Sequence, residues 1–340
     1  MKKLPNIDLQ LGPLYDLLIG AVKTRVLLAA LELNVFNATA SACRAKEVAL
    51  KLGTHPGNTA LLLDALTALK LLDKQDGAYQ TRVSVAPALS PDSPANIGML
   101  LTMMHAMETE PVADLPSLVR NGPPRENADF GTEEIWAGYA RAMANYQRSG
   151  MAQKMAVMVE DIPGFASWKK MLDLGGGPGL FCIAMVSRHP SLQGVVFDQP
   201  AVATVAETFI AEYELQDRIR AVGGDYVNDP IGDGYDLVWA SATLNFVRGN
   251  LVPFLEKIYR AMAPGGVFVS LAEGMTAERT EPASMVLGTL SHGLMGQDFL
   301  FDAGEIARAM NEAGFSSVRS IPVETSMVPM VLDIATKECD

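Results

Sequence analysis

A run of glycines in the second half of the chain joins two short apolar segments. The run reads Met171-Leu-Asp-Leu-Gly-Gly-Gly-Pro-Gly-Leu180. The residues before it, apolar apart from Asp173, predict the end of a buried strand, and the apolar residues after Gly179 predict a helix. Glycine is used where the backbone adopts positive φ or lies close to a ligand. A strand, a glycine turn and a helix N-terminus together predict a nucleotide-binding site.

The composition favours an acidic, folded protein. The chain has 340 residues, of which 49% are hydrophobic, and a formal net charge of −12. This length suggests one large or two ordinary domains. Nucleic-acid binding needs clustered Lys and Arg, so we expect no nucleic-acid partner.

Neither a metal site nor a membrane segment is expected. The three cysteines, Cys43, Cys182 and Cys339, are far apart, and no His/Asp/Glu cluster has the spacing of metal ligands. No apolar run approaches the roughly 20 residues of a membrane span. The segment 1–9 makes a poor signal peptide, because a proline and an acid soon interrupt it, which favours a cytoplasmic protein.

Residues 1–92 predict a winged-helix dimerisation domain. The segment 14–31 is apolar around most of its circumference, so a helix there must be buried on more than one side, which points to a subunit interface and a homodimer. Helical patterns at 45–53 and 58–72 precede a hairpin signal at Asp76-Gly77. Winged helices also bind DNA. The second of these helices carries only Lys70 as a base, so we favour the dimerising interpretation.

Residues 93–167 predict a helical bridge that contributes to a substrate pocket. The stretch 97–107 is rich in methionine, a residue that adapts to irregular cavities and ligands, and it contains His105. Further along, four residues recur at spacings of three and four on one helix face; they are Trp136, Tyr139, Met143 and Tyr146. The alternative is that this face is plain core.

Residues 168–340 alternate between strand and helix patterns. This alternation predicts an α/β fold with a parallel, doubly wound sheet, in which ligands bind at the carboxyl ends of the strands. The expected strands are Lys170–Leu174, Gly194–Asp198, Ile219–Val222, Tyr235–Ala240, Gly266–Ala272 and Met327–Ile334. Helices are expected to begin near Gly179, Pro200, Asn250 and Asp302.

Polar residues follow the first strands at positions suited to a nucleoside. The glycines form GxGxG, one residue shorter than the usual dinucleotide pattern. Asp198 follows Gly175 by 23 residues, close to the spacing of an acid that binds a ribose. The third strand ends at Asp225-Tyr226, an acid and a ring that suit an adenine. The fourth ends in small residues at Ala240-Ser241.

This combination resembles the class I S-adenosylmethionine-dependent methyltransferases. The segment Ala261-Met-Ala-Pro-Gly-Gly-Val-Phe-Val-Ser270 is similar to the family's helix end, Pro-Gly-Gly turn and fifth strand. The helical front with its wing resembles, more narrowly, the dimeric small-molecule O-methyltransferases of the caffeate, acetylserotonin and polyketide-tailoring type. The resemblance covers about 14–334. It implies a Rossmann-like methyltransferase sheet behind an N-terminal winged-helix dimerisation domain, with S-adenosyl-L-methionine as cofactor.

The resemblance also implies roles for individual residues around that cofactor. Asp198 would bind the ribose, and the backbone at Gly175 and Gly177 would approach the methionine part. Asp173 would hold the amino end or, on the alternative interpretation, fix the glycine turn. The adenine and sulfonium surroundings would be formed by Asp225, Tyr226, Trp239, Ala240 and Ser241.

One position departs from the family pattern. Many relatives place a histidine base just after the fourth strand, where this chain has Thr243-Leu-Asn-Phe-Val247. Asn245 occupies the histidine position, and an amide is not a base at neutral pH. Three explanations stay open: proximity and orientation suffice, another residue is the base, or the nucleophile is already ionised.

Other side chains are candidates to replace this histidine. His292 is preferred as a catalytic residue, against a structural role, and Glu273 at the end of the fifth strand as an acid that positions the site. His105 and Met295 are expected to line the substrate pocket, where core packing is the alternative. Two further histidines fit less well, since His189 is expected on the surface and His55 at the corner of the helix-turn-helix.

The expected function is methyl transfer to a small, aromatic or polyketide-like acceptor, with oxygen as the favoured acceptor atom. The alternatives are C-, N- or S-methylation, a non-methylating reaction on the same fold, or a cofactor-sensing DNA-binding regulator. The acidic charge of the chain weighs against the regulator.

Overall fold

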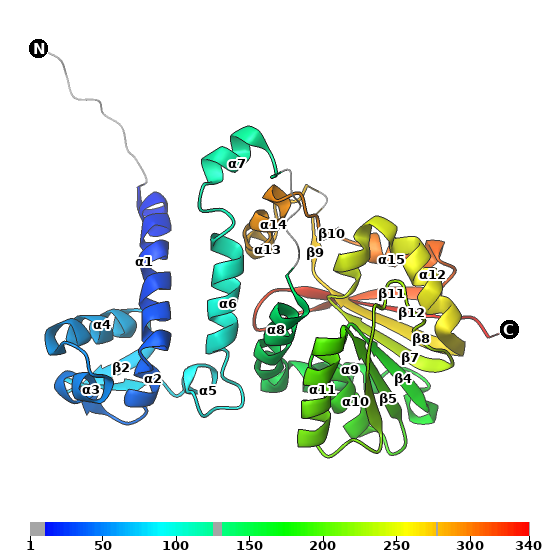
Figure 1. Ribbon diagram of the computed structural model, residues 1–340, viewed down its shortest axis with the longest axis horizontal. Helices are drawn as coiled ribbons and strands as arrows, with labels where there is room; N and C mark the ends of the chain where they lie inside the picture. Colours follow the sequence, from blue (N-terminus) through cyan, green and yellow to red (C-terminus); the bar gives the residue numbers. More distant parts are fainter. Residues whose placement is uncertain (1–10, 125–130, 277, 340) are drawn as a thin grey trace, which may run out of the picture. The chain divides into compact units, whose positions relative to one another are not determined.

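The computed structural model describes residues 11–124, 131–276 and 278–339, in two compact units, Met1–Thr102 and Met103–Asp340 (Figure 1). The boundary between the units falls within helix α6 (Gly98–Thr109). The predicted poor signal segment, residues 1–9, lies outside the described residues. The domain limits at 92 and 167 remain predictions.

The N-terminal unit has the expected helices and wing. Helices α1 (Gly12–Glu32), α2 (Val35–Ala38), α3 (Ala45–Leu52), α4 (Pro56–Ala68) and α5 (Ala86–Leu89) accompany a small sheet in the order β1 (Cys43–Arg44), β3 (Ala78–Thr81), β2 (Leu72–Gln75). Asp76 and Gly77 both have positive φ, the geometry of a two-residue hairpin turn. Helix α4 contains no Lys or Arg, so it offers little to a phosphate backbone.

Helix α1 exposes an apolar surface. Leu14, Tyr15, Leu17 and Leu18 are between 62% and 75% exposed, whereas Ala30 is the buried residue of this helix. The sequence is apolar on every side, so one face can pack on its own unit and another stays uncovered. Contiguous exposed apolar surface of this kind marks an interaction site.

The second unit is built on a seven-stranded sheet in the order β11-β12-β8-β7-β4-β5-β6. The five parallel strands match five of those expected from the sequence. They are β4 (Lys170–Leu174), β5 (Gln193–Asp198), β6 (Ile219–Gly223), β7 (Tyr235–Ser241) and β8 (Met262–Ala272).

The prediction of a parallel sheet does not hold at one edge. Strands β11 (Ser316–Val323) and β12 (Met330–Thr336) are antiparallel, and β12 lies between β8 and β11. A short connection joins them, and such a connection allows only antiparallel pairing. Strand β11 is not among the strands expected from the sequence, because this edge strand is largely solvated and carries Arg319 and Pro322, which weaken its strand pattern.

Helices cover both faces of this sheet (Figure 1). Helices α12 (Leu251–Ala261) and α15 (Glu305–Glu312) pack on one face, and α9 (Ala152–Glu160), α10 (Leu180–Arg188) and α11 (Pro200–Glu212) lie on the other. Because β4, β5 and β6 are parallel, their carboxyl ends lie along the same edge of the sheet, as in other doubly wound folds.

The remaining elements lie outside the seven-stranded sheet and the helices that cover it. The helices among them are α7 (Leu115–Asn121), α8 (Glu133–Tyr146), α13 (Ala283–Gly288) and α14 (Leu290–Leu294), and a π-helical turn (Gln147–Met151) connects α8 to α9. The others are two 3-10 turns, η2 (Phe165–Ser167) and η3 (Leu244–Asn250), and two short strands, β9 (Gly274–Met275) and β10 (Phe301–Asp302). Within the described ranges, none of the helices combines the length and hydropathy needed to cross a bilayer.

Candidate active site

The glycine turn after β4 uses two glycines for different reasons. Gly175 and Gly177 have φ of 63° and 57°, a region that other residues avoid. A Cβ atom on Gly175 would lie 2.6 Å from the Thr243 side chain, whereas one on Gly177 would have nothing within 4 Å. Thr243 is itself fixed, because its hydroxyl donates to the Leu174 carbonyl at 2.7 Å. Gly175 is therefore needed for packing, and Gly177 faces open space.

Asp198 lies beside that open space, at the end of β5. Its carboxylate accepts hydrogen bonds from the backbone N–H of Gly177 at 2.8 Å and of Gln199 at 2.7 Å. Burial raises the pKa of Asp198, and the two N–H donors oppose this. The groups that shift this pKa include no cation. The carboxylate is thus held by backbone donors and keeps acceptor capacity for a ligand with hydroxyl groups.

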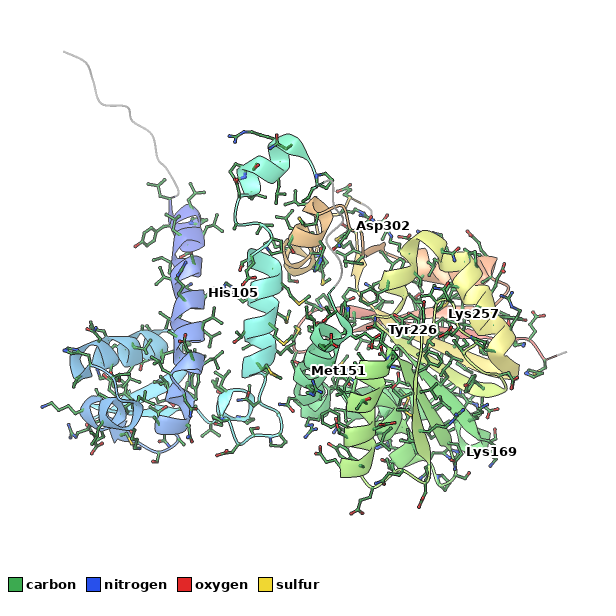
Figure 2. All side chains as sticks on the ribbon, viewed as in Figure 1. His105, Met151, Lys169, Tyr226, Lys257 and Asp302 are labelled. Atoms are coloured by element: carbon green, nitrogen blue, oxygen red, sulfur yellow. The ribbon has the colours of Figure 1, made fainter. Side chains whose placement is uncertain are left out.

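Asp225 and Tyr226 follow β6 near Asp198. Asp225 is exposed and accepts from the Asn228 side chain at 2.6 Å, which lowers the pKa of Asp225. The Tyr226 ring packs on Phe254, 6.2 Å between centroids, and burial together with the charge of Asp198 raises the pKa of its hydroxyl. Figure 2 shows Tyr226 at one end of the sheet and Lys169 at the other. An acid and a ring thus stand at the carboxyl end of the sheet, where the sequence predicted them.

Trp239 lies in the core rather than on the cofactor surface that the sequence analysis expected. It is 0% exposed and packs against Phe181 of α10, 5.2 Å between ring centroids. A side chain without exposed surface has no face to offer a ligand in this arrangement. Ala240 is likewise 0% exposed, whereas Ser241, at the end of β7, is half-buried beside the glycine turn.

Asp173 is buried beneath the glycine turn. Its Oδ2 accepts from the Cys182 backbone N–H at 3.2 Å, and its Oδ1 has no hydrogen-bond partner. Burial raises the pKa of Asp173 to about 7. Gly176 leaves room for this carboxyl, since a Cβ there would lie 2.8 Å from the Asp173 carboxyl carbon. These contacts support the interpretation that Asp173 fixes the glycine turn. Its unpaired Oδ1 is still available to bind a ligand.

The buried Asp173 is expected to make the free energy of unfolding depend on pH. Between about pH 4 and pH 7 the native protein holds a proton at Asp173 that the unfolded chain has lost, so stability falls as pH rises through this window. Asparagine cannot ionise and keeps an oxygen for the Cys182 N–H. We therefore expect Asp173→Asn to gain up to about 4 kcal/mol relative to the wild type between pH 4.5 and pH 8.

Urea unfolding of the ligand-free proteins at several pH values measures this difference. The exposed Asp217→Asn serves as the matched control and should follow the wild type. Parallel pH profiles for wild type and Asp173→Asn would show that Asp173 is ionised in the native protein throughout the range.

Asn245 and Glu273 contact one another where the sequence placed the catalytic group. Asn245 is 9% exposed, and its Nδ2 donates to the Phe299 carbonyl at 2.9 Å. The same amide donates to the Glu273 carboxylate, which opposes the rise that burial causes in the pKa of Glu273. Because both neighbours are acceptors, the orientation of the amide is fixed, and its Oδ1 has no partner.

A band of aromatic rings lies next to this pair. Trp136 of α8 meets Phe246 edge-to-face at 5.3 Å, Phe246 lies 5.6 Å from Phe299, and His292 of α14 lies 5.2 Å from Phe299. Tyr139 extends the band from Trp136 at 6.0 Å. Such rings offer flat apolar surface to an aromatic molecule.

Titratable side chains from three helices gather at the same place. Burial, and then the negative charges of Glu273 and Glu108, raise the pKa of the Tyr139 hydroxyl to about 12. Burial raises the pKa of Glu108 on α6, and the neighbouring His105 and His292 oppose this. Nδ1 of His292 lies 3.3 Å from the Gln297 side-chain oxygen. The structure therefore brings His105, Tyr139, Glu273 and His292 together.

The other predicted substrate residues are buried or half-buried. Tyr146 is 8% exposed and its hydroxyl donates to Thr325 at 3.3 Å. Met143 is half-buried on α8, and Met295 is half-buried directly after α14. The expectation that His189 is on the surface is wrong: it is 2% exposed and accepts the backbone N–H of Leu192 at 2.8 Å.

Four contributing residues were not predicted from the sequence. Thr243 locks the glycine turn, Phe246 and Phe299 form the middle of the aromatic band, and Glu108 joins the titratable group. Only Glu108 left a readable signal, as an acid three residues after His105 in a methionine-rich helix. The others depend on contacts between distant segments.

Ion pairs hold the segment that carries α13 and α14. Asp298 is shared between Arg248 and Arg279, and Arg248 also meets Glu305 at 3.3 Å. Arg279 pairs in addition with Asp302 at 2.8 Å. We call these five residues the ion-pair cluster. It ties the end of this segment to η3 and to α15.

Comparison with known families identifies the chain. Residues 115–316 match the family model for an O-methyltransferase domain, and residues 15–88 match that for an O-methyltransferase dimerisation domain. The chain belongs to the O-methyltransferase family. Enzymes of this family use S-adenosylmethionine, so the chain is an S-adenosylmethionine-dependent methyltransferase, as its sequence predicted.

Relatives of this methyltransferase cover nearly its whole length. Demethylspheroidene O-methyltransferase from Cereibacter sphaeroides is 30% identical, over 91% of this chain and 83% of its own. The 3-hydroxy-5-methyl-1-naphthoate 3-O-methyltransferase from Streptomyces sahachiroi is 28% identical, over 91% of this chain and 90% of its own. Human N-acetylserotonin methyltransferase, solved with S-adenosylmethionine, shares the fold with a TM-score of 0.78 at 23% identity, covering 98% of this chain and 100% of its own.

Proposed function

We propose that this methyltransferase transfers a methyl group from S-adenosylmethionine to a hydroxyl group of a small aromatic or polyketide-like molecule. The observation that carries the proposal is the open glycine cradle at Gly177 beside Asp198, together with the aromatic band, whose Phe246 follows three residues after Thr243, the residue that packs on Gly175. The relatives named for naphthoate, acetylserotonin and tetracenomycin substrates support the same class of acceptor.

The donor side is proposed to bind the cofactor through strand ends and backbone. The residues present fit the group, because Gly177 leaves space that a Cβ would take and Asp198 offers carboxylate oxygens beside it. Asp198 would accept from the ribose hydroxyls, Asp225 and Tyr226 would border the adenine, and Ser241 would lie near the sulfur. When bound, S-adenosylmethionine supplies an activated methyl group.

The acceptor side is proposed to orient a flat molecule. The rings of Trp136, Phe246 and Phe299 would contact its faces and edges. His105, Tyr139 and Met295 would complete the wall, and Met143 and Tyr146 would support it from behind. Holding the two reactants in line removes much of the entropic barrier to transfer.

Methyl transfer from labelled S-adenosylmethionine tests the proposal. The acceptors are 1-naphthol, 3-hydroxy-1-naphthoate and N-acetylserotonin, with 1-naphthylamine as the matched nitrogen acceptor. We expect labelled methyl ethers from at least one phenol. Label in the amine alone would replace the hydroxyl by a nitrogen acceptor, an outcome that fits the relative named as an N,N-dimethyltransferase. No label in any product would contradict the proposal.

We further propose that the protein works as a homodimer through α1, in the cytoplasm. The match to a dimerisation domain and the exposed leucines of α1 support the dimer. The three cysteines are free, which fits a reducing compartment.

Charges on α1 are therefore expected to separate the subunits. In Leu14→Glu/Leu18→Glu each buried carboxylate would lack a partner in the interface, so sedimentation should report about half the wild-type mass. Leu50→Glu, at a residue 86% exposed on α3, is the control and should keep the wild-type mass. An unchanged mass for the double variant would remove α1 from the interface.

A further inference from the structure

Glu273 lies level with the glycine turn. Strands β7 and β8 are parallel, with Ser241 paired to Leu271. Glu273 follows two residues after Leu271, and Thr243, which packs on Gly175, follows two residues after Ser241. Neighbouring strands are about 4.8 Å apart, so Glu273 leaves the sheet one strand away from the segment that carries Thr243. Its side chain is half-buried and so keeps some accessible surface.

Asn245 cannot itself receive a proton. Its Nδ2 hydrogens are used on the Phe299 carbonyl and the Glu273 carboxylate. Its Oδ1 is buried without a partner, and an amide oxygen is not basic at neutral pH. Leaving a buried oxygen unpaired is unfavourable, so the two acceptors around Nδ2 determine the orientation of the amide. In this arrangement Asn245 orients the Glu273 carboxylate.

Glu273 is also available as a base. The groups that shift its pKa are burial, its own backbone N–H and Asn245, and they include no cation that would tie up the carboxylate. Across the site, Tyr139 stays protonated, since its pKa is raised to about 12. Among the other titratable groups there, His292 contacts the Phe299 ring, and Glu108 lies beside His105 and His292. Glu273 is the one that contacts Asn245.

Resting on the proposed function, we propose that Glu273 takes the proton of the acceptor hydroxyl, and that Asn245 positions its carboxylate for this step. The acceptor oxygen forms the new bond to the methyl carbon with a lone pair, and its proton moves to a Glu273 oxygen. The bond between that carbon and sulfur breaks, and its electron pair stays on the sulfur. Glu273 then releases the proton to water.

This role of Glu273 predicts that the methylation rate of the wild type falls at low pH. Burial raises the pKa of Glu273, and the carboxylate must be ionised to act, so the rate falls as pH falls through this raised pKa. Glu273→Gln removes the base and should lower kcat by about 100-fold or more and abolish this acidic limb. Glu110→Gln, an exposed carboxylate-to-amide change on the surface after α6, is the matched control.

Moving the base to position 245 gives the sharpest test. In Asn245→His/Glu273→Gln an imidazole replaces the amide, and we expect kcat about 10-fold above Glu273→Gln, with a new limb near the pKa of histidine. A merely structural Glu273 would not be rescued by this change. The acceptor is the phenol that the wild type methylates best, with the donor saturating.

A second readout does not depend on turnover. In protein with 13C-labelled glutamate carboxyls, the signal missing from Glu273→Gln should titrate above the range of ordinary glutamates. Calorimetry with S-adenosylhomocysteine establishes that each variant binds the donor product, and Glu273→Asp, which keeps a carboxylate, replaces Glu273→Gln if that variant does not fold.

The outcomes separate the two proposals. A wild type that methylates no phenol overturns both. A wild type that methylates a phenol, together with a Glu273→Gln kcat within threefold of it or a double variant no better than Glu273→Gln, overturns the role of Glu273 alone. Loss of the acidic limb in His292→Gln, with the limb retained in Glu273→Gln, would assign the step to His292 instead.

Discussion

The Asp198→Ala protein is expected to bind S-adenosylhomocysteine at least about 100-fold more weakly than the wild type. A carboxylate that accepts from two ribose hydroxyls makes two charge-assisted hydrogen bonds, each contributing about 1.5–3 kcal/mol. Asp198 is also the residue that meets the Gly177 N–H, so its loss removes the side wall of the cradle. Isothermal titration calorimetry measures the loss directly.

Two comparisons isolate binding from folding. Burial raises the pKa of Asp198, so removing the carboxylate relieves a desolvation cost while losing two backbone hydrogen bonds, and we expect melting of the ligand-free protein to change little. Asp217→Ala, at an exposed acid outside the site, should bind like the wild type. Wild-type affinity in Asp198→Ala would remove Asp198 from the cofactor site.

The two glycines of the turn are expected to fail in opposite ways when changed to alanine. Gly175→Ala places a Cβ 2.6 Å from Thr243 at a positive φ and should destabilise the fold by about 3 kcal/mol, the sum of backbone strain and overpacking. Gly177→Ala has a similar φ but open space, so about 1 kcal/mol of strain is expected. Its methyl group instead enters the cofactor's space.

Urea unfolding and calorimetry with S-adenosylhomocysteine report the two effects separately. Gly175→Ala should lose stability well beyond Gly177→Ala, and Gly177→Ala should lose affinity by about 10-fold while remaining folded. Equal losses of stability in the two variants would mean that backbone strain, and not the contact with Thr243, dominates at Gly175. Because both positions have positive φ, each variant is the control for the other.

The donor half of the molecule was readable from the sequence because it is local. A buried strand, a glycine turn and a helix leave their periodicity and residue types within a short stretch, and five parallel strands were found in this way. The edge strand β11 escaped because polar residues and Pro322 interrupt its pattern. Its pairing with β12 is a tertiary choice that no local signal encodes.

The acceptor half was readable only as a set of candidates. Asn245, Glu273 and His292 lie on separate segments, and the sequence could not say which of them touch. Trp239 shows the opposite error, since its place at a strand end predicted a ligand contact while the alternation of the strand turned it towards Phe181. Whether that face is buried depends on the helix that packs on it, here α10.

The ion-pair cluster anchors the segment with α13 and α14 independently of the donor cradle. The donor cradle is made of backbone and strand ends, whereas α13 and α14 sit on one stretch of chain whose end Asp298 pins to Arg248 and Arg279. Residues between these anchors can therefore vary without disturbing the cradle. A lineage of such enzymes can acquire new acceptors by rewriting this stretch while its methyl donor stays the same, provided that the charges that fasten it are kept.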